Sequence, residues 1–113
     1  MANAQRGEVT LAAGSQTLTL RLTFNAICAM ETRTGKTYGQ LILGLSRLDF
    51  VATRELLFQA LQAHHAKDYP TVASVGDLIE TIRVSRAIDA LTDLMKANAA
   101  KEDEGAVNPP AAQ

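Results

Sequence analysis

The sequence predicts an α+β domain in which an N-terminal β-hairpin precedes a mainly helical bundle of about five helices. Two observations predict this class: apolar and polar residues alternate up to residue 24, and from residue 25 the apolar spacing becomes helical. The chain has 113 residues, of which 47% are hydrophobic, as in a globular protein of one domain. We expect a single domain over residues 1–98, with the hairpin at about 7–24, the helices at about 25–98 and a disordered tail at 99–113.

The predicted hairpin consists of two strands that meet at a turn around Gly14 and Ser15. The apolar side of the two strands is formed by Val9, Leu11, Ala13, Leu18, Leu20, Leu22 and Phe24. An isolated two-stranded ribbon is marginally stable in water. We therefore expect this side to cover helices or to meet another subunit.

Start and stop signals define the first two helices. Asn25 is expected to cap the first helix, which should end at Gly35. Thr37 and Gln40 form a capping-box pattern at the start of the second helix. One face of this second helix has the i, i+3, i+4, i+7 spacing of an amphipathic stripe, with Tyr38, Leu41, Ile42 and Leu45.

Three further helices are expected. The third begins near Asp49 or Thr53 and ends before Pro70, because proline disfavours a helical residue in front of it. Thr71 caps the fourth helix, and the fifth runs from about residue 85 to residue 98. A charge cluster, a glycine and a Pro-Pro pair follow, which predict the disordered tail.

The sequence gives little support for a phosphate or metal site. Gly35 and Lys36 resemble part of a phosphate-binding loop, but Met30 stands where that motif needs a second glycine. His64 and His65 are adjacent, so on a helix their side chains diverge by about 100°, and no convincing third ligand lies near. We expect the histidines to form a polar helix end, and we expect no metal and no cofactor.

Catalysis has equally little support. Cys28 lies in an apolar helix without a local activating charge and is expected to be a small buried side chain. The carboxylates are scattered, and no pair stands out as a general acid and base. We therefore expect a protein without enzyme activity.

The charge pattern argues against a nucleic-acid ligand, and the short apolar runs argue against a membrane span. The 11 basic and 12 acidic residues are intermixed, whereas proteins that follow a phosphate backbone concentrate their cations. Arg83 and Arg86 near a helix start leave a DNA-binding regulator as a less favoured alternative, since Asp89 and Asp93 follow on the same helix. The longest apolar run, residues 41–45, is too short to cross a bilayer, and a single cysteine suits a reducing cytosol.

The apolar patterning exceeds what so small a domain can readily bury, which predicts a docking surface for another chain. The candidate partner-binding surface consists of Tyr38, Leu41, Ile42, Leu45, Leu56 and Phe58. Core packing remains the simpler explanation for each leucine taken singly. If the surface hypothesis holds, changing Leu41 and Leu45 to lysine leaves a folded protein that no longer binds its partner.

Two stretches carry a resemblance to known proteins. "RGEVTL" is followed by "LTLRLTFNAICAMETRTG", so that Arg-Gly-Glu opens the first strand and Thr23-x-Asn25-Ala26 precedes a helix with Glu31 and Gly35. "VGDLIETI", from Val75 to Ile82, matches a later helix. In this order the features resemble the gene-transfer-agent family of phage tail proteins over roughly residues 6–98, although residues 44–58 carry no matching anchor.

The resemblance implies a tail assembly chaperone. Such a protein would act in the cytoplasm of a bacterial host, bind the tape measure protein and other tail proteins during tail assembly, and be absent from the finished particle. Self-association into a homo-oligomer remains open. The alternative is a structural tail tube or minor tail component retained in the particle, which would use the hairpin edges to extend sheets. A single hairpin is little β-structure for a tube-forming subunit.

Overall fold

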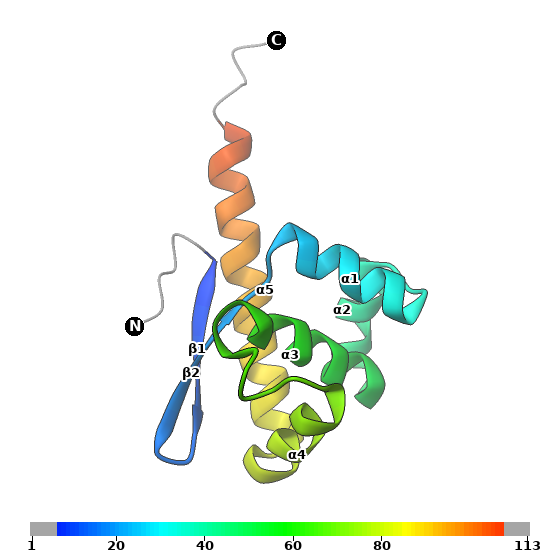
Figure 1. Cartoon of the computed structure of the whole chain (residues 1–113). Coiled ribbons are helices and arrows are strands. Elements are labelled where there is room, and N and C mark those ends of the chain that lie inside the picture. The colour runs from blue at the N-terminus through cyan, green and yellow to red at the C-terminus, as the bar shows by residue number, and fades with distance from the viewer. Residues whose placement is uncertain (1–6, 108–113) are drawn as a thin grey trace.

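The computed structural model describes residues 7–107, with side chains through residue 100. It contains an antiparallel β-hairpin followed by five helices, which confirms the predicted α+β class (Figure 1). The elements are β1 (Glu8–Ala13), β2 (Gln16–Arg21), α1 (Phe24–Thr34), α2 (Tyr38–Ser46), α3 (Phe50–His65), α4 (Val72–Ile82) and α5 (Val84–Val107).

The apolar face of the hairpin packs on the helices. A two-residue turn joins the paired residues Ala13 and Gln16, and its first residue, Gly14, has a φ of 64° that only glycine adopts without strain. Leu11 pairs with Leu18, and both are buried because β1 packs on α5 and β2 packs on α3. The predicted alternation is confirmed in β2 and around Leu11 in β1, whereas Glu8, which does not belong to the predicted apolar side, is buried at the start of β1.

Helix α3 is the centre of the core. It contacts β2 and each of the other four helices. Five of its residues are completely buried, namely Thr53, Leu56, Leu57, Ala60 and Leu61. Ala52, Glu55 and Gln59 are buried as well, so the buried residues occupy more than half of the helix circumference, as expected for a helix surrounded by neighbours.

The strand-to-helix junction differs from the prediction by two residues. Thr23, not Asn25, caps α1, and its Oγ1 accepts a hydrogen bond of 3.1 Å from the backbone N–H of Ala26. Because β2 ends at Arg21, Phe24 no longer follows the strand alternation. It is the first residue of α1, and 78% of it is exposed, so its predicted inward orientation is wrong.

The other predicted helix ends are largely confirmed. Gly35 ends α1 with a φ of 73°, and Thr37 forms a complete capping box with Gln40. Asp49 and Thr71 cap α3 and α4.

Helix α5 is longer than predicted and runs to Val107 instead of ending near residue 98, so its C-terminal part extends beyond the other elements (Figure 1). Alanine, lysine and glutamate, which dominate residues 99–104, are strong helix formers. Residues 108–113 of the predicted tail lie outside the described part.

Candidate functional site

The predicted partner-binding surface does not lie on the outside of the domain. Leu41, Leu45 and Leu56 are only 1%, 5% and 0% exposed, and they belong to the core. The reason is that α2 packs on α3, so its apolar stripe is the face by which it joins the bundle. The prediction that these three leucines form an exposed docking surface is therefore wrong.

The remaining three predicted residues are half-buried. Tyr38 donates a hydrogen bond from its hydroxyl to the Met95 sulfur at 3.0 Å, and burial raises the pKa of this tyrosine. Phe58 lies beneath the Arg33 guanidinium, whose carbon is 5.3 Å from the ring centre. Ile42 on α2 is partly exposed. The Tyr38 and Phe58 side chains also pack against the core.

A different apolar surface is exposed where α2 turns into α3. Four large side chains lie in this short segment, and we call them the apolar corner: Leu43, Leu48, Phe50 and Val51, which are 47%, 60%, 61% and 62% exposed. Scattered single apolar residues are normal on a protein surface, whereas a cluster marks an interaction site. The corner is therefore a candidate binding surface.

The backbone of this corner is tight. The N–H of Asp49 donates to the Gly44 carbonyl at 2.8 Å. A Cβ on Gly44 would lie 3.0 Å from the Ala52 Cβ and 3.1 Å from the Asp49 Cβ, so any larger residue there would require these neighbours to shift. Between them Leu48 takes a φ of 59°, which is uncommon for a residue with a bulky side chain.

Asp49 fixes the start of α3. Its carboxylate accepts hydrogen bonds from the Ala52 N–H at 3.1 Å and from the Lys36 ammonium at 3.2 Å. These two interactions hold the pKa of the Asp49 carboxyl below its usual value, the backbone bond contributing most. Phe50 and Val51, the next two residues, are turned outward in the first turn of α3.

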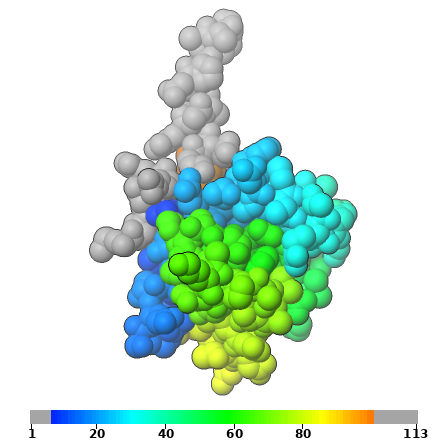
Figure 2. Space-filling view, viewed as in Figure 1, coloured from blue at the N-terminus to red at the C-terminus, as the bar shows by residue number. Residues whose placement is uncertain are grey.

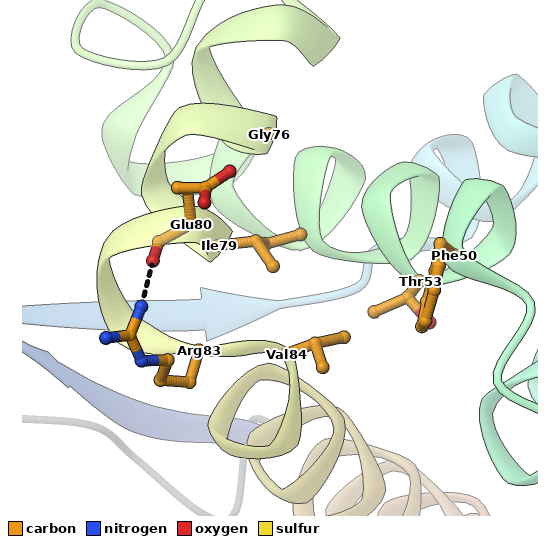
Figure 3. Close-up of a pocket in the computed structure, with 7 residues that line it drawn as sticks. All are labelled: Phe50, Thr53, Gly76, Ile79, Glu80, Arg83 and Val84. Atoms are coloured by element: carbon orange, nitrogen blue, oxygen red, sulfur yellow. Dashed lines mark hydrogen bonds between the residues drawn. The ribbon is translucent and has the colours of Figure 1, made fainter.

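A pocket of about 290 Å³ adjoins the corner, between α3, α4 and the start of α5 (Figure 3). We call it the α3–α4 pocket, and it is lined by Phe50, Thr53, Gly76, Ile79, Glu80, Arg83 and Val84. In Figure 3 Ile79, Val84 and Phe50 surround its open space. The Arg83 side chain lies to one side, where its Nη1 donates to the Glu80 backbone carbonyl at 3.1 Å.

Two backbone features of this pocket lower the stability of the fold. Arg83 has a φ of 85°, a conformation that is sterically disfavoured for a non-glycine residue. Gly76 lies inside α4, where glycine costs about 1 kcal/mol relative to alanine. No close approach demands it, since a Cβ on Gly76 would have the Arg54 Cδ as its nearest neighbour at 3.6 Å, an ordinary contact.

The residues that suggested a phosphate loop have structural roles. Gly35 ends α1, Thr37 caps α2, and Lys36 forms an ion pair with Asp49 at 3.2 Å. Cys28 is exposed on α1, so its predicted burial is wrong. Among the described residues no group of three or more histidine, cysteine, aspartate or glutamate side chains could hold a metal ion.

The two histidines join the end of α3 to the hairpin. His64 Nε2 lies 2.9 Å from a carboxylate oxygen of Glu8, which is buried. His65 Nε2 accepts the backbone N–H of Thr19 at 2.9 Å, which requires an unprotonated Nε2. Burial lowers the pKa of His65, the neighbouring His64 lowers it further, and Asp68 opposes the shift.

Mild acid is therefore expected to weaken the fold through His65. Its pKa is lower in the folded than in the unfolded chain, so the unfolded chain binds the proton more readily below about pH 6.5. The contribution of His65 is complete above this pH and is lost as the pH falls toward the lowered pKa. Urea unfolding at pH 7.5 and pH 5.5 checks this. His65→Gln, whose amide oxygen accepts the Thr19 N–H without titrating, should lose less stability than the wild type, and an equal loss would contradict the assignment.

No protein family model, curated protein or solved structure matches this chain. Within the described residues, no helix combines the length and the apolar character needed to cross a membrane.

Proposed function

We propose that this chain is a non-enzymatic tail assembly chaperone that binds the tape measure protein while a phage tail or a phage-like particle is built. The observation that carries the proposal is the apolar corner. Leu48, Phe50 and Val51 are each about 60% exposed in a small domain with few aromatic residues. Exposed apolar clusters of this kind are typical of surfaces that contact another protein.

The identity of the partner comes from the sequence resemblance. A tape measure protein is long, so many copies of a small chaperone would dock along it. Each copy would contribute a modest apolar contact, and the sum over many copies would give firm binding. The chaperone would act in the host cytoplasm and leave before the particle is complete.

Co-expression with the tape measure protein of the same gene cluster tests the proposal. The test variant carries Leu48→Asn and Val51→Thr, which remove two apolar side chains of the corner. Asparagine tolerates the positive φ at position 48, and threonine keeps the shape of valine, so the fold should be retained. We expect the amount of co-purified tape measure protein to fall about tenfold, the effect of losing an apolar anchor.

Phe24→Ser is the control, because it removes an even more exposed apolar side chain that does not belong to the corner. It should leave the binding of the tape measure protein unchanged. Equal co-purification by the corner variant and the wild type would refute the role of the corner. Abundant peptides of this chain in purified particles would favour a retained structural component instead.

A further inference from the structure

A single residue connects α4 to α5. Helix α4 ends at Ile82 and α5 begins at Val84, so only Arg83 lies between them. The N–H of Arg83 donates to the Ile79 carbonyl at 2.8 Å, four residues back as in an α-helix. The Arg83 carbonyl accepts the N–H of Ala87 at 3.3 Å, again with helical spacing. The hydrogen bonds of both helices therefore meet at this residue, and the interruption is confined to its backbone angles.

The local sequence provides no reason for this interruption. Arg83 has a φ of 85° and a ψ of 143°, which are sterically disfavoured for a residue with a side chain. At Gly14 and Gly35 the chain has a glycine where a positive φ is needed. Residues 80–86 contain neither glycine nor proline, and arginine is a strong helix former. The packing of α5 on the rest of the domain therefore maintains the interruption.

A straight helix satisfies more of the local backbone. If Arg83 took helical angles, the N–H of Val84 would bond to the carbonyl of Glu80, and the next two N–H groups would find acceptors in the same way. In the bent state the Glu80 carbonyl accepts a hydrogen bond from the Arg83 guanidinium instead, at 3.1 Å. Straightening would release this side chain, remove the strained φ and join residues 72–107 in one helix.

The junction of α4 with α5 lies on the surface. Arg83 is exposed, and Figure 3 shows it where the chain passes from α4 to α5. The yellow atoms of this junction form the lower edge of the molecule in the space-filling view (Figure 2). No other element covers the junction in this view, so α5 can move away as a unit when Arg83 rotates.

Helix α5 needs an apolar surface to lie on. Its buried face includes Ala87, Ala90, Leu91 and Leu94, and it packs on β1, α3 and α4. Exposing this face to water is unfavourable, so α5 leaves its site only where an equivalent site receives it. The structure shows the fit of α5 to one such site, and a second copy of this chain carries the same site.

We infer that two copies of this chain exchange α5 by straightening at Arg83, so that α5 of each copy lies on β1 and α3 of the other. The exchange is reciprocal and therefore closes at two chains. Short hinges under strain favour such an exchange. Because association costs translational and rotational freedom, the single chain remains the main form in dilute solution. This inference does not depend on the identity of any client.

Refolding from urea at increasing protein concentration, followed by sedimentation velocity, tests the inference. The wild type should form a species of two chains whose share rises with concentration, and nothing larger. Arg83→Gly should favour the single chain, because glycine adopts the positive φ without strain and disfavours the straight helix. We expect its ratio of dimer to monomer to fall at least about tenfold, the order set by one strained residue.

Lys96→Gly is the matched control for helix propensity. Position 96 is exposed and lies inside α5, so it is helical in both the bent and the straight state. This variant should form dimer in the same ratio as the wild type. Arg83→Ala keeps the strained φ, loses the bond to Glu80 that only the bent state has, and favours the helix. It should form more dimer than the wild type.

Cross-linking identifies the exchanged contact. The Tyr38 hydroxyl lies 3.0 Å from the Met95 sulfur, and the two residues lie on opposite sides of Arg83 in the sequence. One chain carries Tyr38→Cys and the other Met95→Cys, both with Cys28→Ser to remove the native thiol. After the two chains are refolded together, a short bis-maleimide should join them. A chain with both new cysteines, refolded in dilute solution, should cross-link within itself, which shows that the reagent spans the contact.

Four results would overturn the inference. They are a wild type that refolds only to single chains at every concentration up to its solubility limit, an Arg83→Gly variant that forms as much dimer as the wild type, a loss of dimer in both Arg83 variants, and a dimer whose chains do not cross-link through positions 38 and 95. The last result would show that the two copies meet through their outer surfaces.

Discussion

Replacing Leu41 and Leu45 together with lysine unfolds the domain. Both side chains are in the core, with 1% and 5% exposure. Losing a buried leucine costs about 2–5 kcal/mol, and burying an unpaired ammonium adds to each loss. The sum approaches the whole stability of a domain, which is roughly 5–15 kcal/mol. Circular dichroism at 25 °C should show loss of most of the helical signal and no cooperative melting.

The control for this experiment is Leu43→Lys, on the same helix but 47% exposed. It should keep the helical signal and a cooperative transition. A double variant of Leu41 and Leu45 that melted like this control would mean that α2 is not part of the core. The expectation from the sequence alone, a folded double variant, is thereby reversed.

Arg33→Leu should destabilise the domain by about 1–3 kcal/mol, because it leaves the Glu55 carboxylate buried without its cation. The Arg33 Nε lies 2.8 Å from Glu55 Oε2, and the Glu55 side chain is only 6% exposed. The Arg33 side chain is 47% exposed, so solvent screens the pair and the effect stays below that of a fully buried pair. Gln59 still donates to the same oxygen at 3.1 Å. Urea unfolding at pH 7 measures the loss.

A second substitution separates the ion pair from packing. Combining Arg33→Leu with Glu55→Gln removes the buried charge, so most of the lost stability should return. If the double variant is as unstable as Arg33→Leu alone, the loss comes from the contact of Arg33 with the Phe58 ring and not from the carboxylate.

The parts of the fold that the sequence predicts are those set by local chemistry. Strand alternation depends on neighbours two residues apart, and caps such as Thr37 with Gln40 depend on residues three apart. The apolar stripe of α2 can also be read from nearby residues, but the surface that it packs against is distant in the sequence. Leu41 and Leu45 have the same pattern whether they meet α3 or a second protein, so the sequence cannot assign them to core or surface.

The apolar corner was missed, although a signal for it exists. In many helices an apolar residue just before the cap packs on an apolar residue at the fourth helical position. Here Leu48 precedes the cap Asp49, and the fourth position of α3 holds Thr53. Because Leu48 lacks an apolar partner at this position, its side chain is expected to be exposed. The exposure of Phe24 had no such signal, because it depends on the strand ending at Arg21.

The histidine contacts could not be predicted either. His65 and Thr19 are 46 residues apart, and His64 and Glu8 are 56 apart. Only the packing of β2 on α3 brings them together. The sequence indicates a polar helix end at this point and gives no means to choose its partners.

The contact of His65 with Thr19 has a consequence for how copies of this protein can assemble. The backbone N–H of Thr19 points away from β1 and is taken up by an imidazole of the same chain. An incoming strand needs a row of free backbone groups along a sheet edge. This edge of β2 is therefore closed to strand addition at its centre for as long as His65 is neutral. Polymerisation through a continuous sheet, the route open to a tube subunit, would first have to displace a side chain that also fastens the hairpin to α3.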